Sequence, residues 1–233
     1  MSLHLMQSPP SRYAFFDVDG TILRLRSMLT FQEFYYRYRV RFAPLGALNA
    51  WRSRLWWDYN IVTRRDRHVV NRKYYESLRG RRQAEVREFA LRWYEHEKKS
   101  RTQLFITDTV KAIEKHRENG VEIVLVSGSF VEILEPLAAE LGARHCLATV
   151  LEVENGRYTG RILPPQMIGD GKAKAIRTFL SDMQAQAAEC FAYGDHHTDI
   201  PMLETVGIPV AISGDSQLTE HAASRGWEIL TPA

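Results

Sequence analysis

The sequence predicts an α/β fold: a parallel sheet with helices on both faces, into which an all-helical cap is inserted. Short apolar runs alternate with segments of helical period, and strands that alternate with helices form parallel sheets. Three of these runs end directly at an Asp, a Ser or a Gly-Asp pair. By contrast, the long stretch 24–103 shows no strand pattern and has the spacing of helices.

The sheet is expected to contain four buried strands, at Tyr13–Phe16, 121–126, 191–193 and 210–212. Each is a short apolar run of the kind that a strand covered on both faces requires. Helices are expected between them at 109–118, 130–141, 172–180 and 200–206. Ser129 is expected to open the second of these helices and Gly142 to close it. This order predicts a Rossmann-like core.

A hairpin and a cap depart from the alternation. Residues 147–163 alternate apolar and polar around Asn155-Gly156, a strong hairpin signal, so an antiparallel flap is expected there. The cap is expected to contain four helices, at 24–42, 45–61, 66–78 and 83–99. Turns are expected at 43–46 and 80–82, where Pro or Gly occurs.

The chain is accordingly divided into a core (12–23 and 104–233), a helical cap (24–103) and a flexible leader (1–11). The leader lacks the basic start and apolar block of a signal peptide, and no apolar run approaches the ~20 residues that span a bilayer. Cys146 and Cys190 stand apart from each other, without the spacing of a disulfide framework. A cytoplasmic protein is therefore expected.

The formal net charge of +3 conceals a strong asymmetry. Residues 24–102 contain 20 Lys and Arg against 8 Asp and Glu, together with 15 of the 25 aromatic residues. Such a shift marks a domain boundary and suggests an anionic partner near the cap. A solvated helical surface rich in Arg would give the same counts, and this alternative stays open.

Polar side chains follow three of the expected strands. Asp17 and Asp19 follow the first strand, Ser127 follows the second, and Asp195 and Asp199 follow the third. Because ligands of an open parallel sheet bind beyond the carboxyl ends of its strands, these side chains are expected to meet in one crevice.

The same residues belong to four short motifs: Phe15-Phe16-Asp17-Val18-Asp19-Gly20-Thr21, Val126-Ser127-Gly128-Ser129, Gly171-Lys172 and Tyr193-Gly194-Asp195-His196-His197-Thr198-Asp199. In this order they resemble the haloacid dehalogenase superfamily, and within it the phosphoserine-phosphatase-like branch, subfamily IB, which has a helical cap. The hairpin, the stretch 199–203 and Gly226-Trp227 are similar to that branch as well. The resemblance extends over residues 12–230 and implies Mg²⁺-dependent hydrolysis of a phosphate monoester.

The resemblance implies a role for each polar residue of the first motif. Asp17 would attack phosphorus and carry an aspartyl-phosphate. Asp19 would protonate the leaving alkoxide and later activate the hydrolytic water. Gly20 lets the backbone turn sharply, and Thr21 is expected to fix that turn through its hydroxyl as part of the phosphate-binding set.

The second and third motifs would bind the phosphate. Ser127 and the Gly128 amide are expected to hold its non-bridging oxygens, with help from the amides at the start of the following helix. Lys172 would supply a positive charge for both the phosphate and Asp17. Lys174 is the competing candidate, and Gly171-Lys172 fits the family pattern better.

A Mg²⁺ ion is expected at Asp195, Asp17 and the backbone carbonyl of Asp19, with Asp199 bound directly or through water. Hard oxygen ligands are those that Mg²⁺ prefers. His196 and His197 are unusual in this motif. They are either solvent-facing loop residues or a sign of a softer metal such as Mn²⁺.

One position departs from the phosphoserine phosphatases, in which an acidic residue early in the cap segment recognises the substrate's amino group. The nearby positions here are Arg24, Leu25, Arg26 and Ser27. An Arg would instead favour a further anionic group on the substrate. Arg26 is therefore the expected specificity residue, and phosphoserine is not the expected substrate.

The expected function is thus that of a phosphomonoesterase for a small anionic phosphorylated metabolite. A phosphotransferase would use the same residues and differ only in the acceptor that fits the closed site. A different class, a nucleic-acid or membrane-surface binder, is supported by the basic, aromatic cap, although no known nucleic-acid motif occurs there. The sequence does not set the oligomeric state.

Overall fold

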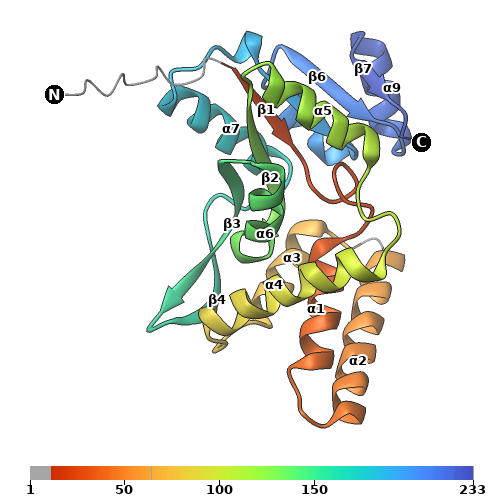
Figure 1. Ribbon diagram of the computed structural model, residues 1–233, viewed down its shortest axis with the longest axis vertical. Helices are drawn as coiled ribbons and strands as arrows, with labels where there is room; N and C mark the ends of the chain where they lie inside the picture. Colours follow the sequence, from red (N-terminus) through yellow and green to blue (C-terminus); the bar gives the residue numbers. More distant parts are fainter. Residues whose placement is uncertain (1–11, 64, 233) are drawn as a thin grey trace, which may run out of the picture.

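The computed structural model describes residues 12–63 and 65–232, so the predicted leader 1–11 lies outside the described residues. The described strands form one sheet in the order β4-β3-β2-β1-β5-β6-β7 (Figure 1). All neighbouring pairs run parallel except β3 and β4, which confirms the predicted α/β sheet. The strands are β1 (Tyr13–Phe16), β2 (Glu122–Phe130), β3 (His145–Glu154), β4 (Arg157–Leu163), β5 (Phe191–Gly194), β6 (Ile208–Ile212) and β7 (Glu228–Leu230).

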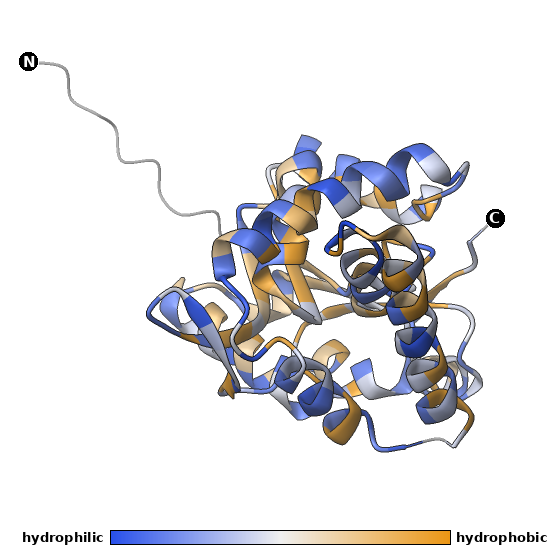
Figure 2. Cartoon of the chain, turned by 90° about the horizontal axis from the view of Figure 1, so that it is seen from below, coloured by the Kyte–Doolittle hydropathy of each residue, from blue (hydrophilic) through white to orange (hydrophobic). Residues whose placement is uncertain are grey.

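Helices cover both faces of the sheet. Successive side chains of a strand point to opposite faces, and both faces are apolar here, so each needs a covering layer. In β1, Ala14 and Phe16 join one hydrophobic cluster, and Tyr13 and Phe15 join the other. The first cluster lies under α5, α6 and the cap, and the second lies under α7, α8 and α9. In Figure 2 the strands at the centre are largely orange, whereas the helices around them alternate orange with blue. The bounds are α5 (Thr107–Glu118), α6 (Val131–Leu141), α7 (Asp170–Asp182), α8 (Ile200–Leu203) and α9 (Ser216–Arg225).

Two predicted features of the core need correction. α6 begins at Val131, and its predicted opening by Ser129 is wrong, because β2 continues to Phe130, which pairs with Thr149 of β3. The hairpin predicted at 147–163 is confirmed as β3 and β4, turning through Asn155 and Gly156. However, β3 also pairs with β2, so the hairpin is the edge of the main sheet and not a separate flap.

The inserted segment forms four helices, as predicted: α1 (Ser27–Tyr38), α2 (Ala43–Val62), α3 (Arg67–Glu76) and α4 (Gln83–Ser100). The turn predicted at 43–46 is wrong. These residues begin α2, with Pro44 in the first turn, where its missing N–H would have no partner in the helix. None of the described helices is both long and apolar enough to cross a membrane.

The chain enters and leaves the cap at adjacent points. Arg24 N donates to Leu104 O at 2.8 Å, and Ile106 N donates to Ile22 O at 2.8 Å. The chain bends at Arg24 and Leu25 and is extended at Arg26, so α1 begins at Ser27 and not at Arg24 as predicted. The division into core (12–23 and 104–233) and cap (24–103) stays a prediction.

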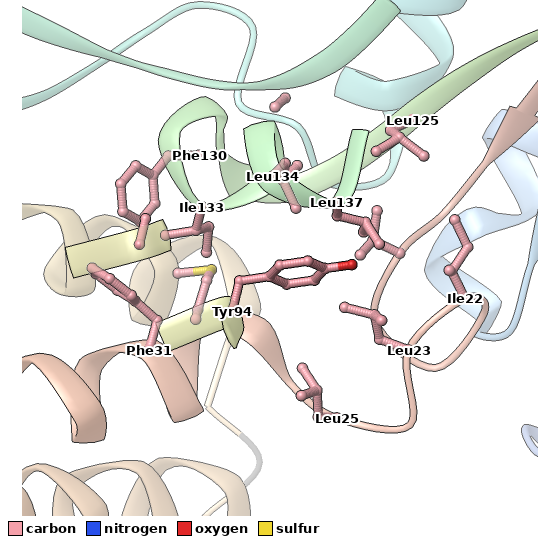
Figure 3. Close-up of a cluster of buried hydrophobic side chains, with 14 of the residues drawn as sticks. Ile22, Leu23, Leu25, Phe31, Tyr94, Leu125, Phe130, Ile133, Leu134 and Leu137 are labelled. Carbon is pink, nitrogen blue, oxygen red and sulfur yellow. The ribbon is translucent and has the colours of Figure 1, made fainter. Parts of the chain in front are cut away.

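Cap and core share one hydrophobic cluster. Figure 3 shows Phe31 of α1 and Tyr94 of α4 beside the apolar side chains of α6, among them Ile133 and Leu137. The Phe31 ring centroid lies 5.7 Å from that of Phe130 and 6.0 Å from that of Trp93. The cap is therefore packed against the core and is not a loosely tethered module.

Phe31→Ala is expected to lower the free energy of unfolding by about 3–5 kcal/mol, because it removes a fully buried ring from the joint between cap and core. Equilibrium urea denaturation measures the change. Phe42→Ala is the matched control: Phe42 is 67% exposed, and its loss should change the value by less than about 0.5 kcal/mol. Equally small effects of the two variants would contradict a shared core.

Candidate active site

Three carboxylates meet at the carboxyl ends of β1 and β5. The strands are neighbours, and Asp17 N donates to Tyr193 O at 2.9 Å just beyond their pairing. One carboxylate oxygen from each of Asp17, Asp195 and Asp199 lies within 4.8 Å of the other two. The structure therefore brings together three of the four acidic side chains that the strand-end pattern predicts to converge.

Lys172 lies between two of these carboxylates. Its Nζ is 2.6 Å from Asp17 Oδ1 and 2.7 Å from Asp199 Oδ1, and its side chain is buried at the start of α7. Burial alone would lower the pKa of Lys172, but the two carboxylates outweigh it and raise the pKa above its usual value. Lys174, the competing candidate, is exposed. Lys172 thus remains an ammonium that neutralises part of the acidic cluster.

Glycine is required just before this lysine. A Cβ on Gly171 would lie 1.8 Å from the backbone oxygen of Gln166, so any larger residue would force the turn apart. Gly171 N closes that turn by donating to Ile168 O at 3.0 Å. The Gly171-Lys172 pair is therefore explained by backbone packing as well as by charge.

Asp19 is held by the first residue of the cap helix α1. Its Oδ2 accepts from Ser27 N at 2.9 Å and from Ser27 Oγ at 3.0 Å, whereas its buried Oδ1 has no partner in the described part of the chain. Burial raises the pKa of Asp19 to about 7, although the Ser27 bonds oppose the shift. At neutral pH this carboxyl group can therefore either donate or accept a proton.

In the turn after Asp19, the backbone of Gly20 lies against the side chain of Asp195. Gly20 has a φ of 87°, and a Cβ there would lie 2.1 Å from Asp195 Oδ2. The Thr21 hydroxyl donates to Asp195 Oδ1 at 3.1 Å. The predicted part of Thr21 in fixing the turn is thus corrected: its hydroxyl orients a neighbouring carboxylate instead.

The number of acidic groups in this cluster exceeds the number of basic ones. Burial, together with the Asp17 and Asp199 charges, raises the pKa of Asp195 to about 8. Burial and Asp199 also raise the pKa of Asp17, while Lys172 opposes the shift. A single ammonium does not balance three close carboxylates, and hard oxygen ligands of this kind fit a divalent cation such as Mg²⁺.

The Ser127–Ser129 segment is positioned from both sides. The carbonyl oxygen of Gly128 accepts from Tyr75 Oη at 2.7 Å, Thr149 Oγ1 at 2.8 Å and Asn71 Nδ2 at 3.3 Å. The amide of the same peptide unit, Ser129 N, donates to Ser127 Oγ at 3.1 Å. The cap helix α3 and strand β3 therefore set the direction of the Ser127 hydroxyl.

His196 and His197 lie beside the acidic cluster and group with Asp215 rather than with the three aspartates. His197 Nδ1 is 2.9 Å from Asp215 Oδ2, and burial together with Arg67 lowers the pKa of His196 to about 4. Arg67 of α3 donates to Thr198 Oγ1 at 2.9 Å. A softer metal at the aspartates therefore gains no support from these histidines.

Arg26, the expected specificity residue, is exposed at the residue before α1, next to Ser27.

Several residues that shape the site are not indicated by the sequence. The residues that touch the motifs from the cap or from β3 carry no sequence signal, because each is a single polar residue in a helix or strand. They are Ser27, Arg67, Asn71, Tyr75 and Thr149.

Comparisons with known proteins place this chain among hydrolases of one family. A family model described as haloacid dehalogenase-like hydrolase matches residues 14–204. "Phosphoserine phosphatase SerB1" of Mycobacterium tuberculosis is 30% identical over 229 residues, which are 93% of this chain and 69% of that protein. "Probable phosphatase Rv3661" of the same species is 39% identical over 130 residues, which are 56% of this chain but only 45% of that protein. This match therefore spans less than half the length of that relative.

A solved structure is similar in fold. The crystal structure of a protein of unknown function from Bordetella pertussis Tohama I is 24% identical, with a TM-score of 0.79. The similarity covers 94% of this chain and 97% of that chain. The arrangement of core and cap is thus found in a second protein.

Asp195→Asn is expected to raise the melting temperature of the metal-free protein at pH 9 by several degrees, at about 2–4 °C per kcal/mol. The folded-state pKa of Asp195 is raised to about 8, so its ionisation costs stability as pH rises from about 4 through 8. At pH 5, only about one pH unit above the ordinary pKa of an Asp, most of this cost has not yet developed, so the gain should be much smaller than at pH 9. Thermal melts in a chelator at both pH values measure the effect.

The exposed Asp182 offers a matched control. Asp182→Asn should change the melting temperature by the same small amount at both pH values, because Asp182 does not belong to the cluster of carboxylates. If Asp195→Asn were less stable than the wild type at pH 9 without metal, the charge crowding inferred for the three carboxylates would be refuted.

Proposed function

The chain belongs to the haloacid dehalogenase-like hydrolase family, and we propose that it is a Mg²⁺-dependent phosphomonoesterase working through an aspartyl-phosphate on Asp17. One observation carries this proposal: Lys172 lies between Asp17 and Asp199, at 2.6 and 2.7 Å, in a largely buried cluster that includes Asp195. Such an arrangement suits hydrolysis of a phosphate monoester, because the negative charge of the ester repels a nucleophile until that charge is neutralised.

The metal would be held by the side chains of Asp17 and Asp195 and by the backbone carbonyl of Asp19. Asp199 would bind it directly or through water. When bound, Mg²⁺ would neutralise charge on the phosphate and on the carboxylates. The hydrogen bond from Thr21 to Asp195 and that from Lys172 to Asp199 hold two of these side chains in place.

In the first step a carboxylate oxygen of Asp17 attacks phosphorus. A bond between that oxygen and phosphorus forms, and the bond from phosphorus to the leaving oxygen breaks. The leaving alkoxide takes a proton from Asp19, whose free Oδ1 is available while Oδ2 is held by Ser27. A pKa of about 7 suits a group that is protonated for this transfer and ionised afterwards.

In the second step ionised Asp19 removes a proton from water, and the water oxygen attacks phosphorus. The bond between Asp17 and phosphorus breaks, inorganic phosphate leaves, and Asp17 and protonated Asp19 are restored. Ser127, the Gly128 amide and Lys172 would hold the non-bridging oxygens in both steps. The hydrogen bonds to the Gly128 carbonyl support this role, because they keep the segment from rotating.

For the substrate we propose a small phosphorylated metabolite with a further anionic group. A relative 30% identical to this chain is named phosphoserine phosphatase. Yet Arg26 stands near the position where an acidic residue would be needed to bind an amino group, and Arg67 is a second cation, hydrogen-bonded to Thr198. Both guanidinium groups favour carboxylate or phosphate over ammonium.

Asp17→Asn is expected to lower the rate of phosphate release from p-nitrophenyl phosphate by about 10³-fold or more, since an amide is a poor nucleophile. The wild type should be active with Mg²⁺ and inactive with a chelator. Asp182→Asn serves as control and should retain full activity. Product analysis with added alcohols distinguishes phosphate release from phosphoryl transfer to an acceptor.

A wild-type protein that stays inactive with Mg²⁺ and with Mn²⁺ on a broad panel of phosphate esters would refute the hydrolase proposal. Full activity of Asp17→Asn would be compatible with a phosphatase but would contradict the covalent intermediate on Asp17.

A further inference from the structure

The outward side of helix α2 is apolar although it faces solvent. Leu48, Trp51, Leu55, Tyr59 and Val62 are each between 46% and 80% exposed. We call these five residues the outer face of α2. Their spacing of three, four, four and three residues places them on one side of a helix, so they form a continuous stripe. Figure 1 shows α1 and α2 projecting from the lower end of the molecule, away from the sheet.

The opposite side of α2 accounts for its packing on the rest of the cap. The buried residues of the helix are Gly46, Ala50, Ser53 and Asn60, all of them small or polar. At 100° per residue, they lie across the helix from the stripe. Trp57, on this same side, is partly buried and donates to Gln32 Oε1 at 2.8 Å. The five large side chains of the outer face thus remain exposed, although a surface helix usually turns such a stripe toward the core.

Cations without carboxylate partners surround the stripe. Arg41 lies before α2, Arg52 within it and Arg65 after it, and none forms an ion pair with any described residue. Arg65 stacks on Tyr59, with its Cζ 5.6 Å from the ring centroid. The one acidic residue of α2, Asp58, is paired with Arg54 at 3.1 Å. The charge that this surface offers to a partner is thus positive.

We propose that the outer face of α2 docks on the surface of an anionic lipid bilayer. A helix with an apolar side bordered by Arg lies in the plane of the lipid headgroups, with its apolar side buried roughly 5–10 Å. Trp51 and Tyr59 are of the type that prefers the membrane–water boundary. Arg41, Arg52 and Arg65 would contact lipid phosphates while their aliphatic parts remain on the apolar side.

Charge complementarity favours the bilayer over a second copy of the chain. Two copies joined through this face would bring their unpaired Arg52 side chains together without a carboxylate, in a segment with 20 Lys and Arg against 8 Asp and Glu. Nucleic acid would match the charge but would leave Leu48, Leu55 and Val62 without an apolar partner. An anionic bilayer satisfies both the charge and the apolar surface, and this proposal is independent of the proposed phosphatase activity.

The experiment is co-sedimentation with vesicles of phosphatidylcholine alone or with about 30% phosphatidylglycerol. The wild type should bind the anionic vesicles at least about tenfold more tightly, and less tightly when salt rises from about 0.1 M to about 0.5 M. Leu55→Glu and Arg52→Glu should each weaken binding by about tenfold. Leu91→Glu, which alters an equally exposed leucine on α4, is the matched control and should bind as the wild type does.

Thermal melts of the variants establish that they remain folded, as expected for changes at exposed positions. Equal, weak binding to both kinds of vesicle would overturn the proposal. Binding that is lost with Arg52→Glu but kept with Leu55→Glu would also overturn it, because that result describes a purely electrostatic surface. A wild-type dimer in sedimentation velocity that Leu55→Glu dissociates would assign the face to a second copy instead.

Discussion

The structure depends above all on the crowding of carboxylates around one buried ammonium. Asp17, Asp195 and Asp199 meet within 4.8 Å, and Lys172 bridges two of them. Such a cluster would disperse in a flexible chain, because like charges repel. Here it is imposed by the pairing of β1 with β5 and by the absence of a side chain at Gly20 and Gly171. Burial raises the pKa of Asp19, and burial together with the neighbouring carboxylates raises the pKa of Asp195. The raised pKa of Asp19 supports its proposed role in proton transfer.

The cap forms part of the site wall as well as covering it. Ser27 of α1 holds Asp19, and Tyr75 of α3 holds the Gly128 carbonyl. Arg67, also on α3, contacts Thr198 next to Asp199. These hydrogen bonds involve residues of three of the four motifs. The hydrophobic cluster that contains Phe31 and Phe130 holds the cap helices against the core. A displacement of the cap would therefore alter the position of the reacting groups, besides admitting water.

Much of the fold follows from local patterns. The first strand, the Asn155-Gly156 hairpin and the four cap helices are indicated by apolar periodicity and turn residues. The turn predicted at 43–46 is wrong because proline is equally compatible with a loop turn and with the first turn of a helix, where Pro44 lies. The continuation of β2 to Phe130 depends on pairing with Thr149, a contact absent from local sequence. In the site, the rule that ligands gather at strand ends finds Asp17 and Asp195, whereas Ser27 and Tyr75 act through contacts that exist only once the cap has packed.

The central claim is that Asp17 becomes phosphorylated, and a rapid-quench experiment on Asp19→Asn tests it most directly. With p-nitrophenyl phosphate, whose leaving group needs no proton, the first step should proceed, while the second lacks its base. Mass spectrometry of the acid-quenched protein should then find one phosphoryl group on the peptide that contains Asp17. The same peptide should stay unmodified in Asp17→Asn. Turnover without any phosphorylated protein, or a phosphoryl group on another residue, would contradict the account.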